Sequence, residues 1–162
     1  MKKTKIRKAR RSDFEDIFKL IVELAHFEKL TPPTKTAKKR LFHDSFGAKR
    51  KNNILLAQVD NEITGYAFYF YTYSSFLARK TLYLEDIFIS QKFRAKGIGK
   101  LMFKELINTA VKEKCGRMEW CVLDWNINAI YFYNKLGAKP LNDWIYYRKN
   151  LSPSPSPNGE GL

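Results

Sequence analysis

An apolar run that leads directly into a glycine-containing turn constrains this chain more than any other feature. The run is Leu82-Tyr83-Leu84-Glu85-Asp86-Ile87-Phe88-Ile89, and Arg94-Ala95-Lys96-Gly97-Ile98-Gly99 follows within five residues. This order is typical of a buried strand that turns into a helix. Unpaired N–H groups and the positive end of the helix dipole meet at such a helix start, where they attract a polyanion. The segment therefore predicts a phosphate-binding turn.

The chain has 162 residues, a length that suits one domain with a buried core and a cleft. We expect residues 1–150 to form this domain and residues 151–162, rich in serine and proline, to be a disordered tail. The two cysteines, Cys115 and Cys121, are too few for a disulfide framework, and neither a signal peptide nor a long apolar segment is visible. These features predict a cytoplasmic protein that makes no membrane contact.

The net charge of +14, from 30 Lys+Arg against 16 Asp+Glu, is unevenly distributed. Segments 2–11 and 35–51 each carry seven basic residues. Such clusters suit nucleic acid, membrane headgroups or a phosphorylated cofactor, and they are equally typical of a soluble basic surface. Charge alone leaves these alternatives open.

Hydrophobic periodicity predicts a mixed α/β fold. A capping box at Ser12-x-x-Glu15 indicates the start of the first helix, and Thr31-Pro32-Pro33 marks its end. Further helices are predicted at 36–43, 99–114 and 128–136, and strands at 5–9, 54–59, 63–73, 82–89, 118–123 and 144–148.

Three motifs in this order of elements carry a resemblance to a known family. They are Arg94-x-x-Gly97-x-Gly99 after the apolar strand, Asp124-Trp125-Asn126 after the next strand, and the helical segment 131–138 with sequence YFYNKLGA. This chain resembles the GNAT superfamily of acetyl-CoA-dependent N-acetyltransferases over roughly residues 5–148. Segments 23–28, 71–73 and 82–86 look like the diamine (spermidine/spermine) N-acetyltransferase branch.

The resemblance implies the GNAT fold and its ligands. We expect a central, mostly antiparallel twisted sheet of about six to seven strands, flanked by about four helices and splayed near the acetyl-CoA site. It also implies acetyl-CoA as co-substrate, a small-molecule amine as acceptor, and a homodimer.

The residues of the turn predict how CoA would be held. The N–H groups of 95–100 are placed to wrap its pyrophosphate, and Arg94, Lys96 and Lys100 add positive charge. The resemblance maps the pantetheine arm onto the backbone of Ile87 and Ile89 and onto Asn126. The full expected set is Ile87, Phe88, Ile89, Arg94, Ala95, Lys96, Gly97, Ile98, Gly99, Lys100, Asn126, Ile127, Asn128, Ala129 and Tyr133.

The reaction requires a base and an acid. An alkyl ammonium with a pKa near ~10.4 must lose a proton before it attacks. Glu85, at the centre of the apolar strand, is the predicted base, because partial burial raises a carboxyl pKa toward the working range. The resemblance places the proton donor for the CoA thiolate at Tyr133, and Tyr131 is a competitor on another helix face. The isolated His26 and His43 do not suggest a metal site, so no metal is expected.

For the acceptor channel the resemblance points to a set of acidic and aromatic residues. The set is Phe27, Glu28, Glu85, Asp86, Glu119, Trp120, Cys121 and Trp144. Because the chain is strongly basic, a short diamine or a lysine-like amine with its own carboxylate suits it better than a long polyamine. Two alternatives stay open: acetylation of a protein or peptide amine, and a basic nucleic-acid-associated module on the same fold.

Overall fold

A computed structural model describes residues 3–151 of the chain. The chain divides into two compact units, Met1–Trp120 and Cys121–Leu162, which are described separately. The predicted tail, apart from Leu151, lies outside the described residues.

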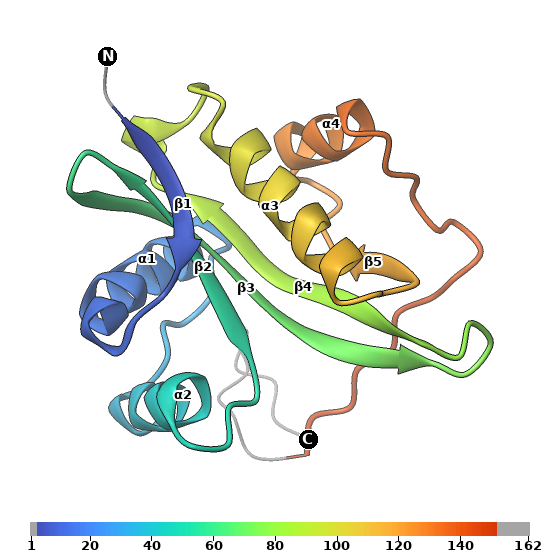
Figure 1. Cartoon of the computed structure of the whole chain (residues 1–162), viewed down its shortest axis with the longest axis horizontal. Helices are drawn as coiled ribbons and strands as arrows, with labels where there is room; N and C mark the ends of the chain where they lie inside the picture. The colour runs from blue at the N-terminus through green and yellow to red at the C-terminus, as the bar shows by residue number, and fades with distance from the viewer. Residues whose placement is uncertain (1–2, 152–162) are drawn as a thin grey trace. The chain divides into compact units, whose positions relative to one another are not determined.

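The first unit contains most of the regular structure (Figure 1). In chain order its elements are β1 (Thr4–Lys8), the 3-10 turn Arg11–Asp13, α1 (Phe14–Phe27), α2 (Lys35–Phe46), β2 (Asn53–Val59), β3 (Glu62–Ser74), β4 (Arg79–Ile89), the 3-10 turn Gln91–Phe93, α3 (Ile98–Lys112) and β5 (Arg117–Trp120). The second unit contains α4 (Ile127–Lys135).

The five strands form one sheet in the order β1-β2-β3-β4-β5. The first four strands pair antiparallel, and β5 joins β4 in parallel. A parallel neighbour requires a crossover connection, and α3 provides it. The predicted mixed and mostly antiparallel sheet is therefore confirmed.

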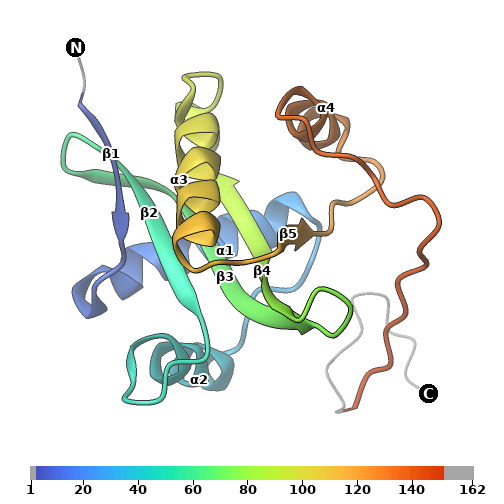
Figure 2. The same cartoon turned by 45° about the vertical axis from the view of Figure 1, so that its right-hand side comes forward.

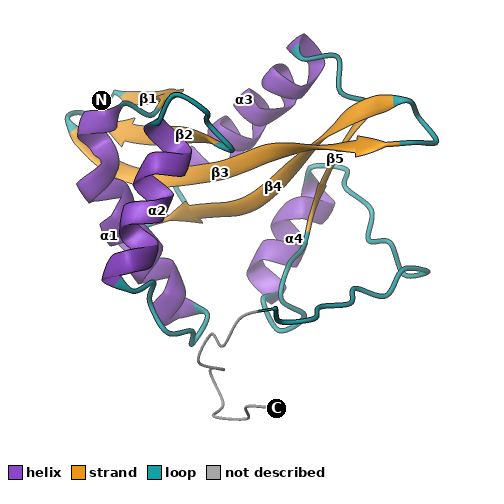
Figure 3. Ribbon diagram, turned by 90° about the horizontal axis from the view of Figure 1, so that it is seen from below, coloured by secondary structure: helices purple, strands orange, loops and turns teal. Residues whose placement is uncertain are grey.

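Helices cover both faces of this sheet, with α1 and α3 on opposite sides (Figures 2 and 3). On the α1 side, Ile17 and Leu20 pack against Ile54, Leu56, Tyr66 and Phe88 from the three central strands. On α3, Met102 and Leu106 are fully buried. Complete burial of such side chains contributes about 1.5–3 kcal/mol each, so this core fixes the central strands in place.

The start of α1 differs from the predicted capping box. Its N-cap residue is Asp13 rather than Ser12, and the Asp13 carboxylate accepts hydrogen bonds from the Arg10 N–H (2.7 Å) and from both terminal nitrogens of Arg7 (2.7 and 2.9 Å). The Arg7 guanidinium also holds the pKa of Asp13 below its usual range. Glu15 instead pairs with Lys38 of α2. This start thus depends on a bond to β1, which a local motif does not reveal.

The expectation of six to seven strands was wrong, since the sheet contains five among the described residues. The strand predicted at 118–123 ends at Trp120. The strand predicted at 144–148 is irregular, and Trp144, Ile145 and Tyr147 are each more than three-quarters exposed. Its aromatic and β-branched residues fit strand propensity, but propensity does not supply the neighbouring strand that a sheet requires.

Gly65 on β3 lets the end of β4 approach closely. A Cβ at this position would lie 2.5 Å from the Phe88 carbonyl oxygen and even closer to the Ile89 side chain. Real Cβ atoms do not tolerate such contacts, so the end of β4 would have to move.

We therefore expect Gly65→Ala to lower the free energy of unfolding in urea by about 1–3 kcal/mol, the range typical of overpacking. Gly116→Ala is the control, because its nearest neighbour is the flexible end of Leu77 at 3.0 Å. Equal effects of the two substitutions would contradict this account.

Candidate active site

The sheet opens between β4 and β5. Within the described part of the chain, their pairing runs from Thr81–Arg117 to Leu84–Trp120 and goes no further, while β4 continues to Ile89. A strand that loses its neighbour presents backbone N–H and C=O groups along that edge. The predicted splay is therefore present, and an extended ligand can pair with this edge as an added strand does.

A β-bulge lies at the same point in β4. Phe68 of β3 pairs with Asp86 and Tyr69 pairs with Leu84, which leaves Glu85 as an extra residue. Directly paired residues share a face of the sheet. Asp86 therefore lies on the face of Phe68, whereas Leu84 lies on the face of Tyr69. The bulge sends Asp86 toward the α1 side and leaves Glu85 exposed.

Of the two adjacent carboxyl groups at the bulge, Asp86 is the more buried. Its Oδ2 accepts a hydrogen bond of 3.2 Å from the hydroxyl group of Tyr66, a side chain with no solvent exposure. Burial and the neighbouring Glu85 charge raise the pKa of Asp86 to about 6. Burial also raises the pKa of Glu28, the residue that follows α1, and the Glu28 charge contributes to the raised pKa of Asp86.

This arrangement corrects the prediction that Glu85 is partly buried. Glu85 is exposed, and the burial expected for it occurs at Asp86. Sequence reasoning missed Tyr66, which reads as one more apolar position of its strand. Its hydroxyl group gains meaning only from the β3–β4 register, which the sequence does not reveal.

The turn after β4 contains two residues in the left-handed region and leads directly into α3. Ala95 and Gly97 have positive φ angles of 59° and 77°, and Gly97 is the N-cap of α3. The Leu101 N–H donates to the Gly97 carbonyl oxygen (3.1 Å), so the N–H groups of Ile98, Gly99 and Lys100 precede the first turn of intrahelical bonds. They are available to an anionic group such as the predicted pyrophosphate.

Arg94 is exposed but makes three contacts with its neighbours. Its Nε donates to the Ile89 carbonyl oxygen (2.9 Å), and its guanidinium carbon lies 4.9 Å from the Phe27 ring centroid and 5.2 Å from that of Phe88. These cation–π contacts join the last turn of α1 to the end of β4. Lys96 donates to the Lys92 carbonyl oxygen (2.9 Å), whereas Lys100 is exposed.

The structure thus brings together, in the first unit, four of the eight residues predicted for the acceptor channel. Phe27 and Glu28 end α1, and Glu85 and Asp86 lie at the bulge. On β5, the Trp120 ring contacts Phe103 of α3 (5.2 Å), and Glu119 pairs with Arg117 (2.9 Å).

The second unit holds the remaining predicted residues. The Asn126 side chain caps α4 by accepting a hydrogen bond from the Ala129 N–H (3.2 Å). Burial raises the pKa of Tyr133 to about 12. Tyr131 is 59% exposed, with the Lys135 ammonium 4.4 Å from its ring centroid, as expected of another helix face. Cys121 and Trp144 are exposed.

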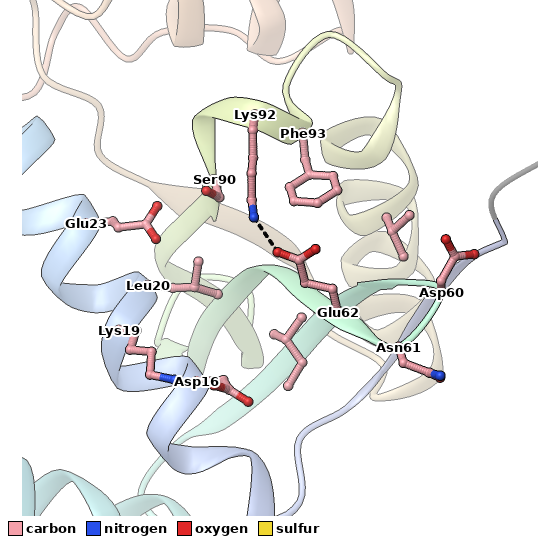
Figure 4. Close-up of a pocket in the computed structure, with 12 residues that line it drawn as sticks. Asp16, Lys19, Leu20, Glu23, Asp60, Asn61, Glu62, Ser90, Lys92 and Phe93 are labelled. Atoms are coloured by element: carbon pink, nitrogen blue, oxygen red, sulfur yellow. Dashed lines mark hydrogen bonds and ion pairs between the residues drawn. The ribbon is translucent and has the colours of Figure 1, made fainter.

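A surface hollow elsewhere in the first unit contains none of the predicted site residues (Figure 4). It lies between α1, the β2–β3 turn and Ser90–Phe93, and its Lys92 and Glu62 side chains pair with each other. Within residues 3–151, no group of three or more His, Cys, Asp or Glu side chains is placed to hold a metal ion, and no helix is long and apolar enough to cross a membrane.

Comparison with known sequences identifies the family. The sequence model of the Acetyltransferase (GNAT) family matches residues 14–138. The chain belongs to this family.

Relatives agree with the branch that the motifs indicate. A thialysine N-epsilon-acetyltransferase of Mus musculus is 35% identical over 91% of this chain and 93% of its own length. A spermidine/spermine N(1)-acetyltransferase-like protein 1 of Homo sapiens is 33% identical over 90% of this chain and 22% of its own length. Among solved structures, an aminoglycoside N-acetyltransferase in complex with CoA superposes with a TM-score of 0.75, at 19% identity over 92% of this chain and 96% of its own. GNAT acetyltransferases use acetyl-CoA.

The raised pKa of Asp86 predicts a pH-dependent stability. An aspartate titrates near ~3.9 in an unfolded chain and near 6 here, so between these values the folded state binds more protons. The contribution of Asp86 to the free energy of unfolding therefore falls as pH rises from about 4 to 6, whereas groups with a lowered pKa such as Asp13 contribute in the opposite direction.

Asp86→Asn keeps the shape and the oxygen that accepts from Tyr66 but carries no charge. We expect the variant to be about 1–3 kcal/mol more stable than the parent at pH 7.5, with the difference vanishing below about pH 4. Urea titrations at several pH values measure this. The exposed Asp143→Asn should show no such trend. A parent and D86N variant of equal stability at pH 7.5 would disprove the assignment.

A substitution of Gly97 tests whether the turn before α3 binds CoA. The positive φ of Gly97 disfavours any other residue, while nothing crowds its Cβ position. Gly97→Ala should cost about 1 kcal/mol of stability and weaken CoA binding, measured by calorimetry. Gly137→Ala is the matched control, since its φ of 82° and open surroundings are the same and it lies outside the turn. Equal weakening by both variants would argue against the turn as the CoA site.

Proposed function

We propose that this protein transfers an acetyl group from acetyl-CoA to a primary amine of a small cationic acceptor, by direct transfer within a ternary complex. The acceptor is a diamine, a polyamine or a lysine-like amine such as thialysine. The observation that carries the proposal is the opening of β4 from β5 after Leu84, which coincides with the bulge at Glu85 and leads into the turn before α3.

The donor would lie along this opening. The backbone of Ile87–Ile89 supplies strand-like pairing for the pantetheine arm, and the N–H groups of the turn receive the pyrophosphate. Exposed Lys100 adds positive charge at the helix start. Asn126 is proposed to contact the arm through its amide NH₂, because its oxygen already caps α4.

The acceptor would meet the carboxylates. Glu28, Glu85 and Asp86 form an acidic site in a chain of net charge +14. The negative charge of this site attracts an ammonium group. The global charge acts against a long polycation, which favours a short diamine or an amine that bears its own carboxylate. The thialysine acetyltransferase that matches 91% of the chain supports the second class.

Three proton movements accompany the reaction. Glu85, exposed at the bulge, is proposed to take the first proton of the acceptor ammonium through a water molecule, after which the neutral nitrogen attacks the thioester carbonyl. As the tetrahedral intermediate collapses, the C–S bond breaks and the thiolate receives a proton from the Tyr133 hydroxyl, while the second proton lost by the nitrogen passes through solvent and restores that hydroxyl. A phenol with a pKa of about 12 keeps its proton at neutral pH and can therefore donate it.

We further propose that the enzyme is a cytoplasmic homodimer. Exposed apolar side chains at 141–151, Leu141, Trp144, Ile145, Tyr146, Tyr147 and Leu151, support burial against another surface.

The proposal is tested by release of free thiol from acetyl-CoA with spermidine, spermine, putrescine, thialysine, lysine and a lysine peptide. We expect turnover with a small amine and a fall in kcat of about 10²–10⁴-fold in Glu85→Gln and Tyr133→Phe. Tyr131→Phe, on the exposed face of the same helix, is the control and should retain activity.

The panel also separates the alternatives. Turnover on the peptide alone would move the acceptor to the protein-amine class. Acetyl-CoA binding without turnover on any amine, together with salt-dependent RNA binding, would favour the nucleic-acid module that the basic segments allow.

A further inference from the structure

The hydrogen bond between Tyr66 and Asp86 is a part-buried polar contact beside the proposed acceptor site. Tyr66 has no solvent exposure, and its ring lies in the core with Ile17 and Phe88. The hydroxyl group of a buried tyrosine usually has a hydrogen-bond partner. Here the partner is a carboxylate that the bulge has turned toward the α1 side.

The charges around Asp86 make this bond important. Glu85 precedes it on β4 and Glu28 approaches from the end of α1, so both carboxylates disfavour its ionisation. The Arg94 guanidinium of the following loop is engaged by the Ile89 carbonyl oxygen and two aromatic rings. Within the described residues, the Tyr66 hydroxyl is the one side-chain donor that the structure gives to Asp86. Its hydrogen bond is thus the contact that favours the ionised form.

We propose that Tyr66 is a positioning residue of the acetyl transfer: its hydroxyl group holds Asp86 ionised and aimed so that Asp86 binds the acceptor ammonium. This inference rests on the proposed function and adds a division of labour to it. Asp86 binds the positive charge of the acceptor, while the neighbouring Glu85 takes the proton. Tyr66 touches neither substrate and acts through Asp86 alone.

The proposal predicts the direction of a pH shift. A hydrogen bond to the ionised form lowers a carboxyl pKa, so its loss in Tyr66→Phe raises the pH at which Asp86 becomes charged. With thialysine as the acceptor probe, and putrescine as a second probe, the acid limb of kcat/KM should move up by about one pH unit. At pH 6, close to the pKa of Asp86 in the parent, this corresponds to a roughly fivefold higher KM for the amine. The kcat value at pH 8 and the KM for acetyl-CoA should stay close to those of the parent.

Tyr69→Phe is the matched control. Tyr69 is 2% exposed on the same strand, but its partner across the ladder is Leu84 on the other face. It loses a buried hydroxyl group without touching Asp86, so its pH profile should match the parent. A purely structural role of Tyr66 would lower the melting temperature and change both KM values at every pH, without moving the acid limb.

A double-mutant cycle keeps the test decisive if Tyr66→Phe folds poorly. In an Asp86→Asn background no carboxylate remains to be held, so adding Tyr66→Phe should leave the amine KM unchanged. A further increase, or an unshifted acid limb in the single variant, would overturn the proposal. Failure of the proposed function looks different, because the parent enzyme itself would then acetylate none of the amines.

Discussion

The bulge at Glu85, one extra residue in β4, determines which face of the sheet Asp86 lies on. Without Glu85 as a bulge, alternation would place Leu82, Leu84 and Asp86 on a single face of the sheet. After Leu84 the extra residue shifts the alternation of side chains to the opposite face of the sheet. Leu82 and Leu84 therefore face α3, whereas Asp86 faces Tyr66 and the α1 core. The pairing with β5 stops at the same residue. A change of face, the loss of a neighbouring strand and a pair of adjacent carboxylates therefore coincide within two residues.

Much of this could be predicted from the sequence because the signals are local. Gly97 before an apolar helix pattern indicated the turn, and hydrophobic periodicity predicted the helix that follows it. The family resemblance pointed to the two carboxylates of the Leu-Glu-Asp run as part of the acceptor channel, and that assignment stays a prediction. Each of these signals depends on residues that lie within one element or its immediate flank.

The remainder depends on relations between distant segments. Alternation assigned burial to Glu85 because a bulge cannot be seen in a single strand, and the structure gives that burial to Asp86. Tyr66 is separated from Asp86 by 20 residues, and only the ladder register makes them neighbours. The start of α1 failed as a local prediction for the same reason, since Asp13 is held by Arg7 of β1. The segment at 144–148 has the composition of a strand but pairs with no strand among residues 3–151.

Arg94 has a consequence beyond its charge. By stacking on Phe27 and bonding to the carbonyl oxygen of Ile89, it ties the end of α1, which precedes Glu28, to the loop that leads to α3. Arg94 thus contacts both the end of α1, next to the proposed acceptor site, and the end of β4, next to the proposed CoA site. If a ligand at one of these sites restricts the motion of Arg94, a ligand at the other site loses less conformational entropy when it binds. Under the proposed function, the donor and the acceptor would then each raise the affinity for the other by the same factor, because such coupling is reciprocal.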